Sequence, residues 1–201
     1  MVHLAIFDYG AGNIFSLKNS LEKTGATVDV ITNFDKPNIY SGLLLPGVGN
    51  FDPAIKSICK SSKTDFINYV KDTPVLGICL GMEMFFEKSE EGNEKGLGVI
   101  KGDVIILPSL MKVPHMGWNN LEIKKSGKIL EGVKDNDWVY FVHSYRVNPT
   151  NNDVITAESD YGIKVPAVVE QGNFFGTQFH PEKSGKVGKI MIQNFLDVCK
   201  K

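Results

Sequence analysis

The chain has 201 residues, of which 42% are hydrophobic and 22% are charged, and its formal net charge is −1. This composition suits one globular domain, residues 1–201, with a full hydrophobic core. The near-zero charge gives no basic field for nucleic acid or an anionic membrane, so we expect small neutral or zwitterionic ligands. No apolar run approaches membrane-spanning length and no basic leader begins the chain, which favours a cytoplasmic protein.

The first half of the chain alternates apolar strands with amphipathic helical patterns, which predicts an α/β fold with a largely parallel sheet flanked by helices. We expect a strand over residues 2–8, a turn at 10–12, and a helix capped by Asn13 and ended by Gly25. The turn lacks the third glycine of a dinucleotide-binding loop, so no nucleotide cofactor is expected there. Apolar runs and turn residues predict the next elements, namely strands over 27–32, 42–45 and 74–78 and helices over 55–71 and 80–87.

The second half changes to several short strands split by turn residues, between residues 97 and 179. Strands over 138–142 and 174–178 are the clearest, and this part should add a mixed or antiparallel edge to the sheet. The closing helix is predicted over 185–199, with an apolar face made by Val187, Ile190, Met191, Phe195 and Val198. No repeat or linker-like stretch divides the chain, which favours a single domain.

Cys79 stands where the apolar run 74–78 ends, with Gly77 and Gly81 on either side. Glycines allow a strand to turn sharply into a helix, and such a turn pushes one side chain outward. We therefore expect a nucleophile elbow whose thiol pKa is lowered by the N-terminus of the following helix. Cys59 and Cys199 are distant and form no CxxC pair, so we expect no disulfide framework, no metal site and a reducing compartment.

His180 and Glu182 lie two residues apart, well after Cys79 in the chain. If their segment is extended, both side chains lie on one side, so the carboxylate can hold one imidazole nitrogen while the other faces the thiol. A lone cysteine or a lone histidine is more often a structural residue. The combination predicts a Cys/His/Glu catalytic set.

A glycine-rich turn at residues 46–49 follows the short strand 42–45 and should lie at the sheet edge where Cys79 emerges. Its peptide N–H groups, that of Val48 above all, are candidates to bind a developing oxyanion together with the N–H of Leu80. The alternative is a tight structural turn without a catalytic role.

Several segments resemble a known family, the class I, triad-type glutamine amidotransferases. Its oxyanion strand, nucleophile and His/Glu dyad are matched in order and spacing by residues 46–49, 77–82 and 179–182. One branch of the family, the glutaminase subunits of histidine biosynthesis, is similar also at residues 8–13, 114–119 and 141–146. The resemblance covers nearly the whole chain and implies a flavodoxin-like, open, mostly parallel sheet.

The resemblance implies that Cys79 attacks the carboxamide of glutamine, that His180 moves protons and that Glu182 orients His180. It places several residues around the substrate: Gly47, Gly49, Glu83, Glu91, Ser144 and Tyr145. The ammonia would pass through a tunnel to a (β/α)8-barrel cyclase subunit, bound as a heterodimer partner, to form imidazole glycerol phosphate and aminoimidazole carboxamide ribotide. Contact with this partner, or gating by it, is expected at His115, Trp118 and Lys183. For Lys183, the alternative is a solvated surface lysine. No cofactor is implied.

Glu83 departs from the family pattern, which usually has glutamine four residues after the nucleophile. On a helix this position shares a face with Cys79, so Glu83 should look into the same pocket. A carboxylate there would disfavour the thiolate and, if it faced the substrate carboxylate, would repel it, although it could still accept a hydrogen bond from an ammonium or amide group. A solvated surface position, at which the change is harmless, is the alternative.

Other functions remain open at this point. A related glutaminase could feed ammonia to a different partner, for example in amidination of a nucleotide sugar. The chain could also be a self-sufficient cysteine hydrolase of the same fold, or a non-catalytic binding subunit. The intact set of Cys79, His180 and Glu182 argues against the last.

Overall fold

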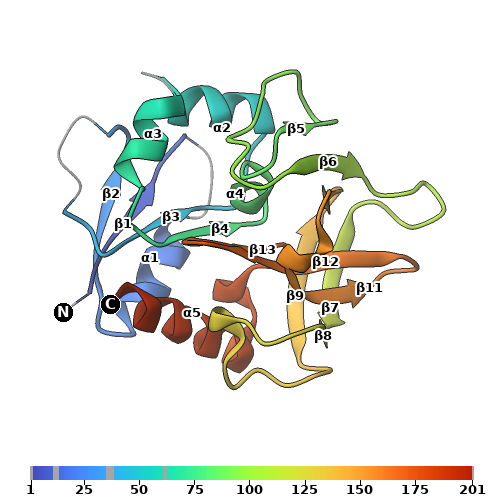
Figure 1. Ribbon diagram of the computed structural model, residues 1–201. Coiled ribbons are helices and arrows are strands. Elements are labelled where there is room, and N and C mark those ends of the chain that lie inside the picture. Colours follow the sequence, from blue (N-terminus) through green and yellow to red (C-terminus); the bar gives the residue numbers. More distant parts are fainter. Residues whose placement is uncertain (1, 11–13, 35–38, 61–62, 201) are drawn as a thin grey trace.

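The computed structural model describes residues 2–10, 14–34, 39–60 and 63–200. Its centre is an eight-stranded sheet (Figure 1) in the order β2 (Thr27–Ile31), β1 (His3–Phe7), β3 (Gly42–Leu45), β4 (Val75–Ile78), β13 (Phe174–Thr177), β12 (Lys164–Gln171), β11 (Ile155–Asp160) and β8 (Glu122–Ile123). The pairs from β2 to β13 are parallel, and those from β13 to β8 are antiparallel. The predicted mostly parallel sheet with an antiparallel edge is confirmed.

Two smaller sheets, which the sequence did not predict as separate units, lie beside the antiparallel edge. One has the order β10 (Tyr145–Pro149), β6 (Gly102–Ile106) and β5 (Lys88–Ser89), and the other pairs β7 (His115–Asn120) with β9 (Trp138–His143). The helices are α1 (Ile14–Glu22), α2 (Phe51–Ile58), α3 (Lys63–Tyr69), α4 (Leu80–Glu83) and α5 (Gly185–Cys199). Short 3-10 turns are η1 (Lys128–Leu130), η2 (Asn152–Val154) and η3 (Pro181–Lys183).

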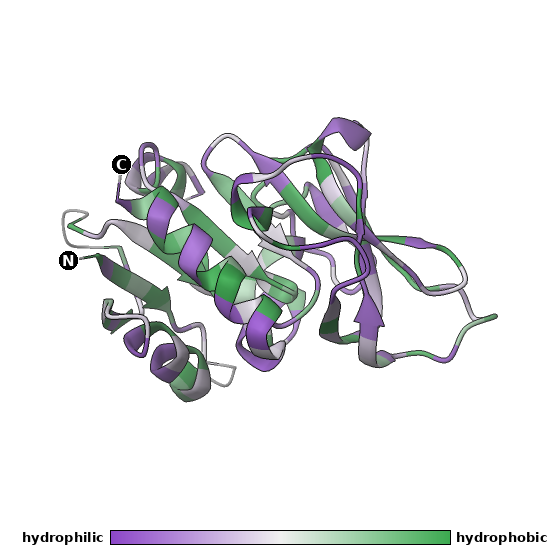
Figure 2. Ribbon diagram, turned by 90° about the horizontal axis from the view of Figure 1, so that it is seen from below, coloured by the Kyte–Doolittle hydropathy of each residue, from purple (hydrophilic) through white to green (hydrophobic). Residues whose placement is uncertain are grey.

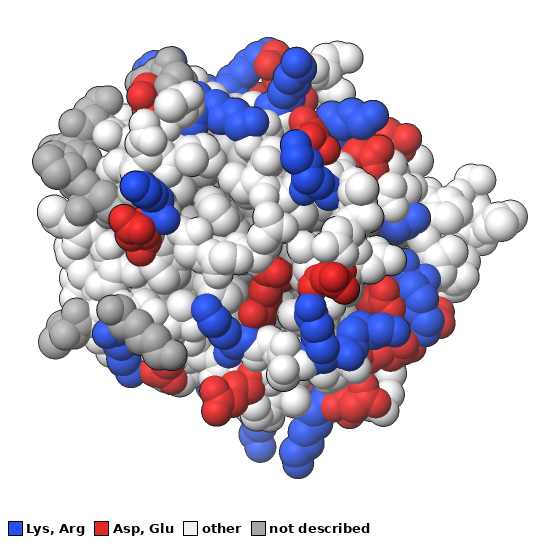
Figure 3. Space-filling view, viewed as in Figure 1, with Lys and Arg blue, Asp and Glu red and all other residues white. Residues whose placement is uncertain are grey.

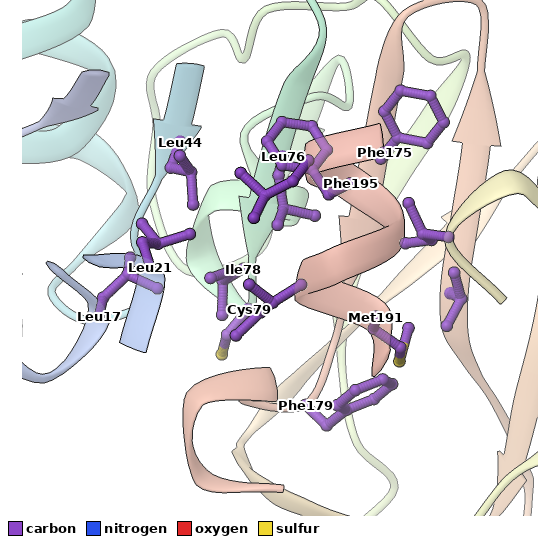
Figure 4. Packing of buried hydrophobic residues seen from close by; sticks show 14 of the residues in the cluster. Leu17, Leu21, Leu44, Leu76, Ile78, Cys79, Phe175, Phe179, Met191 and Phe195 are labelled. Atoms are coloured by element: carbon purple, nitrogen blue, oxygen red, sulfur yellow. The ribbon is translucent and has the colours of Figure 1, made fainter. Parts of the chain in front are cut away.

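The hydrophobic core lies on both faces of the central sheet, because side chains alternate along each strand. In β1, Leu4 and Ile6 join the cluster covered by α1 and α5, whereas Ala5 and Phe7 join the cluster covered by α2 and α3. Figure 4 shows the first cluster, with side chains of α1 and α5 packed against β3 and β4. Coloured by hydropathy, the central strands are mostly green and the helices alternate green and purple (Figure 2).

Three helix predictions need correction. The helix predicted over 55–71 begins earlier, at Phe51, and is two helices, α2 and α3. The helix predicted over 80–87 ends at Glu83, because the next amides bond three residues back, Phe85 N to Met82 O and Phe86 N to Glu83 O. In α5, Met191 and Phe195 are buried as expected, but Ile190 is exposed.

The predicted turn at residues 10–12 and the helix cap at Asn13 fall largely outside the described residues. Charged side chains of both signs lie mixed over the face shown in Figure 3. Within the described ranges, no helix is long and apolar enough to cross a membrane.

Candidate active site

A pocket of about 320 Å³ opens at the carboxyl ends of β3 and β4. It brings together ten residues that the sequence analysis assigned to a site: Gly47, Val48, Gly49, Cys79, Leu80, Glu83, Glu91, Ser144, Tyr145 and His180. It adds three that were not predicted, Pro114, Val142 and His143. Segments from both halves of the chain therefore build one concave site, as is usual at this edge of an α/β sheet.

The backbone at Cys79 is a strained elbow between β4 and α4. Cys79 has φ 51° and ψ −109°, a conformation that costs a non-glycine residue about 1–3 kcal/mol. A Cβ atom at Gly81 would overlap the carbonyl oxygen of Leu45, and one at Gly77 would overlap Gly81. Cys79 N donates to Thr177 O at 2.6 Å, which ties the elbow to β13. Close packing thus holds the thiol at the pocket.

The thiol of Cys79 is buried and only weakly hydrogen-bonded. Its Sγ–H donates to Val142 O at 3.8 Å, and Gln178 Nε2 donates to Sγ at 3.8 Å. Burial raises the pKa of the Cys79 thiol far above its ordinary value, Glu83 raises it further, and the N–H of Leu80 and the Gln178 amide lower it. The expected net lowering by a helix N-terminus is therefore wrong, since α4 has only 4 residues and burial dominates. A base must take the thiol proton.

His180 and Glu182 form the predicted pair, with Nδ1 of His180 2.9 Å from Oε1 of Glu182 and side chains 2% and 7% exposed. The backbone is extended at His180 but not at Glu182, which lies in the 3-10 turn η3. Ser184 supports the turn by donating its hydroxyl to His180 O at 2.7 Å. The carboxylate fixes the proton on Nδ1, and buried Nε2 has no hydrogen-bond partner among the described residues. Nε2 is thus available as a base.

Glu83 is 4% exposed, so its interpretation as a solvated surface residue is wrong. Gln178 Nε2 donates to its Oε1 at 3.0 Å. Burial raises the pKa of Glu83 to about 8, with a smaller rise from Glu91 and an opposing effect of the Gln178 amide. The side chain is therefore mostly neutral at pH 7 rather than the carboxylate that the sequence suggested.

Glu91 and the glycine turn at residues 47–49 both line the pocket. Oε2 of Glu91 accepts the N–H of Phe51 at 3.0 Å, which leaves its other oxygen for a ligand. A Cβ atom on Gly47 would overlap Ile78 O, so only glycine lets the turn approach the elbow this closely.

His143 and His115 form a buried hydrogen-bonded pair beside the pocket. His143 Nδ1 donates to Tyr145 O at 2.7 Å, so His143 Nε2 accepts from His115 Nδ1 at 2.9 Å. Burial lowers the pKa of His143 to about 3 and that of His115 to about 4. His115, predicted at a partner interface, is buried, whereas Trp118 is 53% exposed and Lys183 is exposed.

Sequence reasoning missed Gln178, whose amide links Cys79 to Glu83. A signal for it existed, because Gln178 precedes His180 by two residues at the end of a predicted strand. The carbonyl of Val142 left no such signal, since every residue has one.

Comparison with known proteins identifies the family of this chain. A family model described as "Glutamine amidotransferase class-I" matches residues 5–199. The imidazole glycerol phosphate synthase subunit HisH of Caldanaerobacter subterraneus subsp. tengcongensis is 44% identical over 200 residues, with 98% of each chain covered. The subunit HisH 1 of Methanococcus maripaludis is 46% identical over 203 residues, covering 97% of this chain and 99% of the relative.

Solved structures of lower identity share the fold. A glutamine amidotransferase crystal structure has a TM-score of 0.76 at 18% identity, covering 98% of this chain and 99% of that one. The structure of PurLQS from Thermotoga maritima has a TM-score of 0.74 at 18% identity, with the same coverage of 98% and 99%.

Proposed function

The chain belongs to the class I glutamine amidotransferases and, within them, to the HisH subunits of imidazole glycerol phosphate synthase, and from this premise we propose how its residues hydrolyse glutamine and where the ammonia goes. One observation carries the proposal above all. The strained Cys79 elbow and the buried His180–Glu182 pair come from distant segments and border one pocket. Such a set serves covalent acyl transfer.

The first step forms a thioester. Nε2 of His180 accepts the proton of the Cys79 thiol, and Sγ attacks the carboxamide carbon of glutamine. The N–H groups of Leu80 and Val48 bind the oxyanion. His180 then gives its proton to the leaving nitrogen, and ammonia departs.

The second step releases glutamate. Nε2 of His180 takes a proton from water, whose oxygen attacks the thioester, and the thiolate leaves and regains the proton. Throughout, Glu182 holds Nδ1 and stabilises the imidazolium form. For substrate binding, Glu91 is suited to the α-ammonium group of glutamine, with Ser144 and Tyr145 at the strand junction and Gly49 in the turn.

Glu182→Gln is expected to lower kcat for glutamate release about a hundredfold, because the amide cannot stabilise the imidazolium charge. KM should change little, since Glu182 does not line the pocket. Steady-state kinetics of the complete complex measure both constants. Exposed Glu131, changed to Gln, is the matched control. An unchanged kcat in Glu182→Gln would show that Glu182 takes no part in the mechanism.

For the partner, we propose a (β/α)8-barrel cyclase that uses the channelled ammonia in histidine biosynthesis. We propose that it docks on the exposed face of β7 and β9, beside the pocket. This face carries Met116 and Trp118, and Trp118 packs edge-on against Tyr140 with ring centroids 5.9 Å apart. Apolar aromatic side chains at a surface are typical anchors of a protein interface. His115 is buried beneath this face, so its side chain cannot contact the partner directly.

Trp118→Ala is expected to weaken partner binding about thirtyfold, the effect of losing an anchor of about 2 kcal/mol. Titration calorimetry of the chain against the cyclase measures Kd. Ile39→Ala is the control, because Ile39 is also exposed (69%) but lies before β3, at the opposite end of the strand from the pocket. Equal Kd values for Trp118→Ala and wild type would place the interface elsewhere.

Two experiments test the assignment against its alternatives. Capture of partners from native lysate separates a cyclase from the partner of a related amidotransferase, such as one that amidinates nucleotide sugars. Assay of glutamate release with and without the captured partner separates a subunit that needs activation from a self-sufficient hydrolase. No glutamate release under either condition would indicate a non-catalytic binding subunit.

A further inference from the structure

We propose that Glu83 works as a neutral carboxylic acid beside the nucleophile, and that loss of its proton to solvent switches glutamine hydrolysis off. The inference deepens the proposed glutaminase function and rests on it. In this role Glu83 gains or loses a proton as the pH of the solvent changes. It takes no part in the proton transfers that His180 performs during the reaction.

Contacts of Glu83 place its carboxyl group next to the reaction. Gln178 Nε2 donates to Oε1 of Glu83 at 3.0 Å and also to Sγ of Cys79 at 3.8 Å. Glu83 also lines the pocket that Cys79 and His180 border. One carboxyl oxygen is therefore tied to the amide that contacts the nucleophile, and the carboxyl group borders the space that a ligand would fill.

The groups that face Glu83 offer no cation to stabilise a carboxylate. Glu91, from the loop after β5, adds negative charge and raises the Glu83 pKa. Tyr145 from β10 and Tyr9 after β1 are near enough for the charge on Glu83 to raise the pKa of each. Cys79 from the elbow, His143 of β9 and His180 after β13 are the other titratable groups that line the pocket, and Gln178 is a neutral donor. No lysine or arginine is among the pocket-lining residues that the structure describes.

Ionisation of Glu83 would oppose both the formation of the Cys79 thiolate and the binding of glutamine. Formation of the Cys79 thiolate places a negative charge beside Glu83. If Glu83 is also ionised, the two negative charges repel each other, and the charge on Glu83 raises the pKa of the Cys79 thiol. Glutamine also carries an α-carboxylate into a pocket whose described lining includes no lysine or arginine. The protonated acid avoids both repulsions and presents an O–H donor, whereas the carboxylate only accepts hydrogen bonds.

A glutamine at position 83 keeps the size of the side chain and an N–H donor but has no proton to lose. Glu83→Gln therefore separates charge from shape. Exposed Glu131→Gln repeats the same chemical change far from the pocket lining and serves as the control.

The test measures kcat and kcat/KM for glutamate release by the complete complex between about pH 6 and about pH 10. We expect the wild type and Glu131→Gln to lose about tenfold in kcat/KM per pH unit above about pH 8, and Glu83→Gln to lack this limb. The ratio of Glu83→Gln to wild type should thus rise with pH. The same alkaline limb in Glu83→Gln would overturn the inference.

A second measurement does not depend on turnover. Infrared difference spectroscopy of the full chain detects the carbonyl band of a protonated carboxylic acid, which we expect at pH 7 in wild type, with a midpoint of loss near pH 8, and not in Glu83→Gln. Absence of a Glu83-dependent band at pH 7 would overturn the inference while leaving the glutaminase function intact. If the complex releases no glutamate at any pH, the proposed function fails and the infrared titration still decides the protonation of Glu83.

Discussion

Replacing Cys79 by alanine is expected to lower glutamate release by the complete complex about ten-thousandfold or more, the scale seen when a covalent nucleophile is removed. Serine should fail almost as completely, because its hydroxyl is far harder to ionise in a buried site than a thiol. The fold should survive, since Sγ makes only two long hydrogen bonds, each 3.8 Å. Thermal unfolding followed by circular dichroism checks the fold, and direct assay of glutamate measures the loss.

Cys59→Ser is the matched control for Cys79. Cys59 is a free, half-buried thiol just after α2, and it lies outside the pocket lining. Its replacement should leave glutamate release within about twofold of wild type. Retained turnover in Cys79→Ala would contradict the thioester mechanism.

The isolated chain is expected to hydrolyse glutamine poorly and to be stimulated about a hundredfold or more by the cyclase with its nucleotide ligand. Two features of the structure support this expectation. The Cys79 thiol donates to Val142 O, while Nε2 of His180 has no partner among the described residues. In addition, the turn that carries Val48 has Gly49 at φ 122°, and glycines let the Val48 peptide change orientation at low cost.

Val142 links these features to the proposed docking face, because it lies on β9 opposite Met116 of β7. A partner seated on this face can shift the carbonyl that holds the thiol. Such gating would keep ammonia from being lost to solvent. Glutamate release with and without the cyclase and ligand measures the stimulation, and full basal turnover that the partner does not change would favour a self-sufficient hydrolase.

Replacing Lys183 tests how the partner stimulates the chain, because Lys183 follows Glu182 in the turn η3 and is exposed. Its side chain can reach an acidic group on the partner while its backbone stays tied to the proposed catalytic pair, His180 and Glu182. Lys183→Ala should reduce stimulation more than it weakens binding. Lys189→Ala, an exposed lysine on α5, is the control.

The sequence by itself determined the elements whose causes are local. The strand over 42–45 and the helix over 185–199 have the predicted bounds, because apolar runs and glycines mark their ends. The glycines around Cys79 likewise predicted the elbow, since a sharp turn has few sequence solutions. The motif order also placed the His180 and Glu182 pair correctly, although not its backbone.

Tertiary structure alone decided the properties that depend on segments far apart in the chain. The helix after Cys79 ends at Glu83, where the amides of Phe85 and Phe86 bond three residues back and both side chains are buried in the core. Burial of Glu83 against Gln178 sets its protonation, and burial also reverses the expected shift in the Cys79 pKa. Periodicity and propensity describe neighbours in sequence, whereas desolvation depends on everything packed around a group, so the charge states of the site could come only from the folded chain.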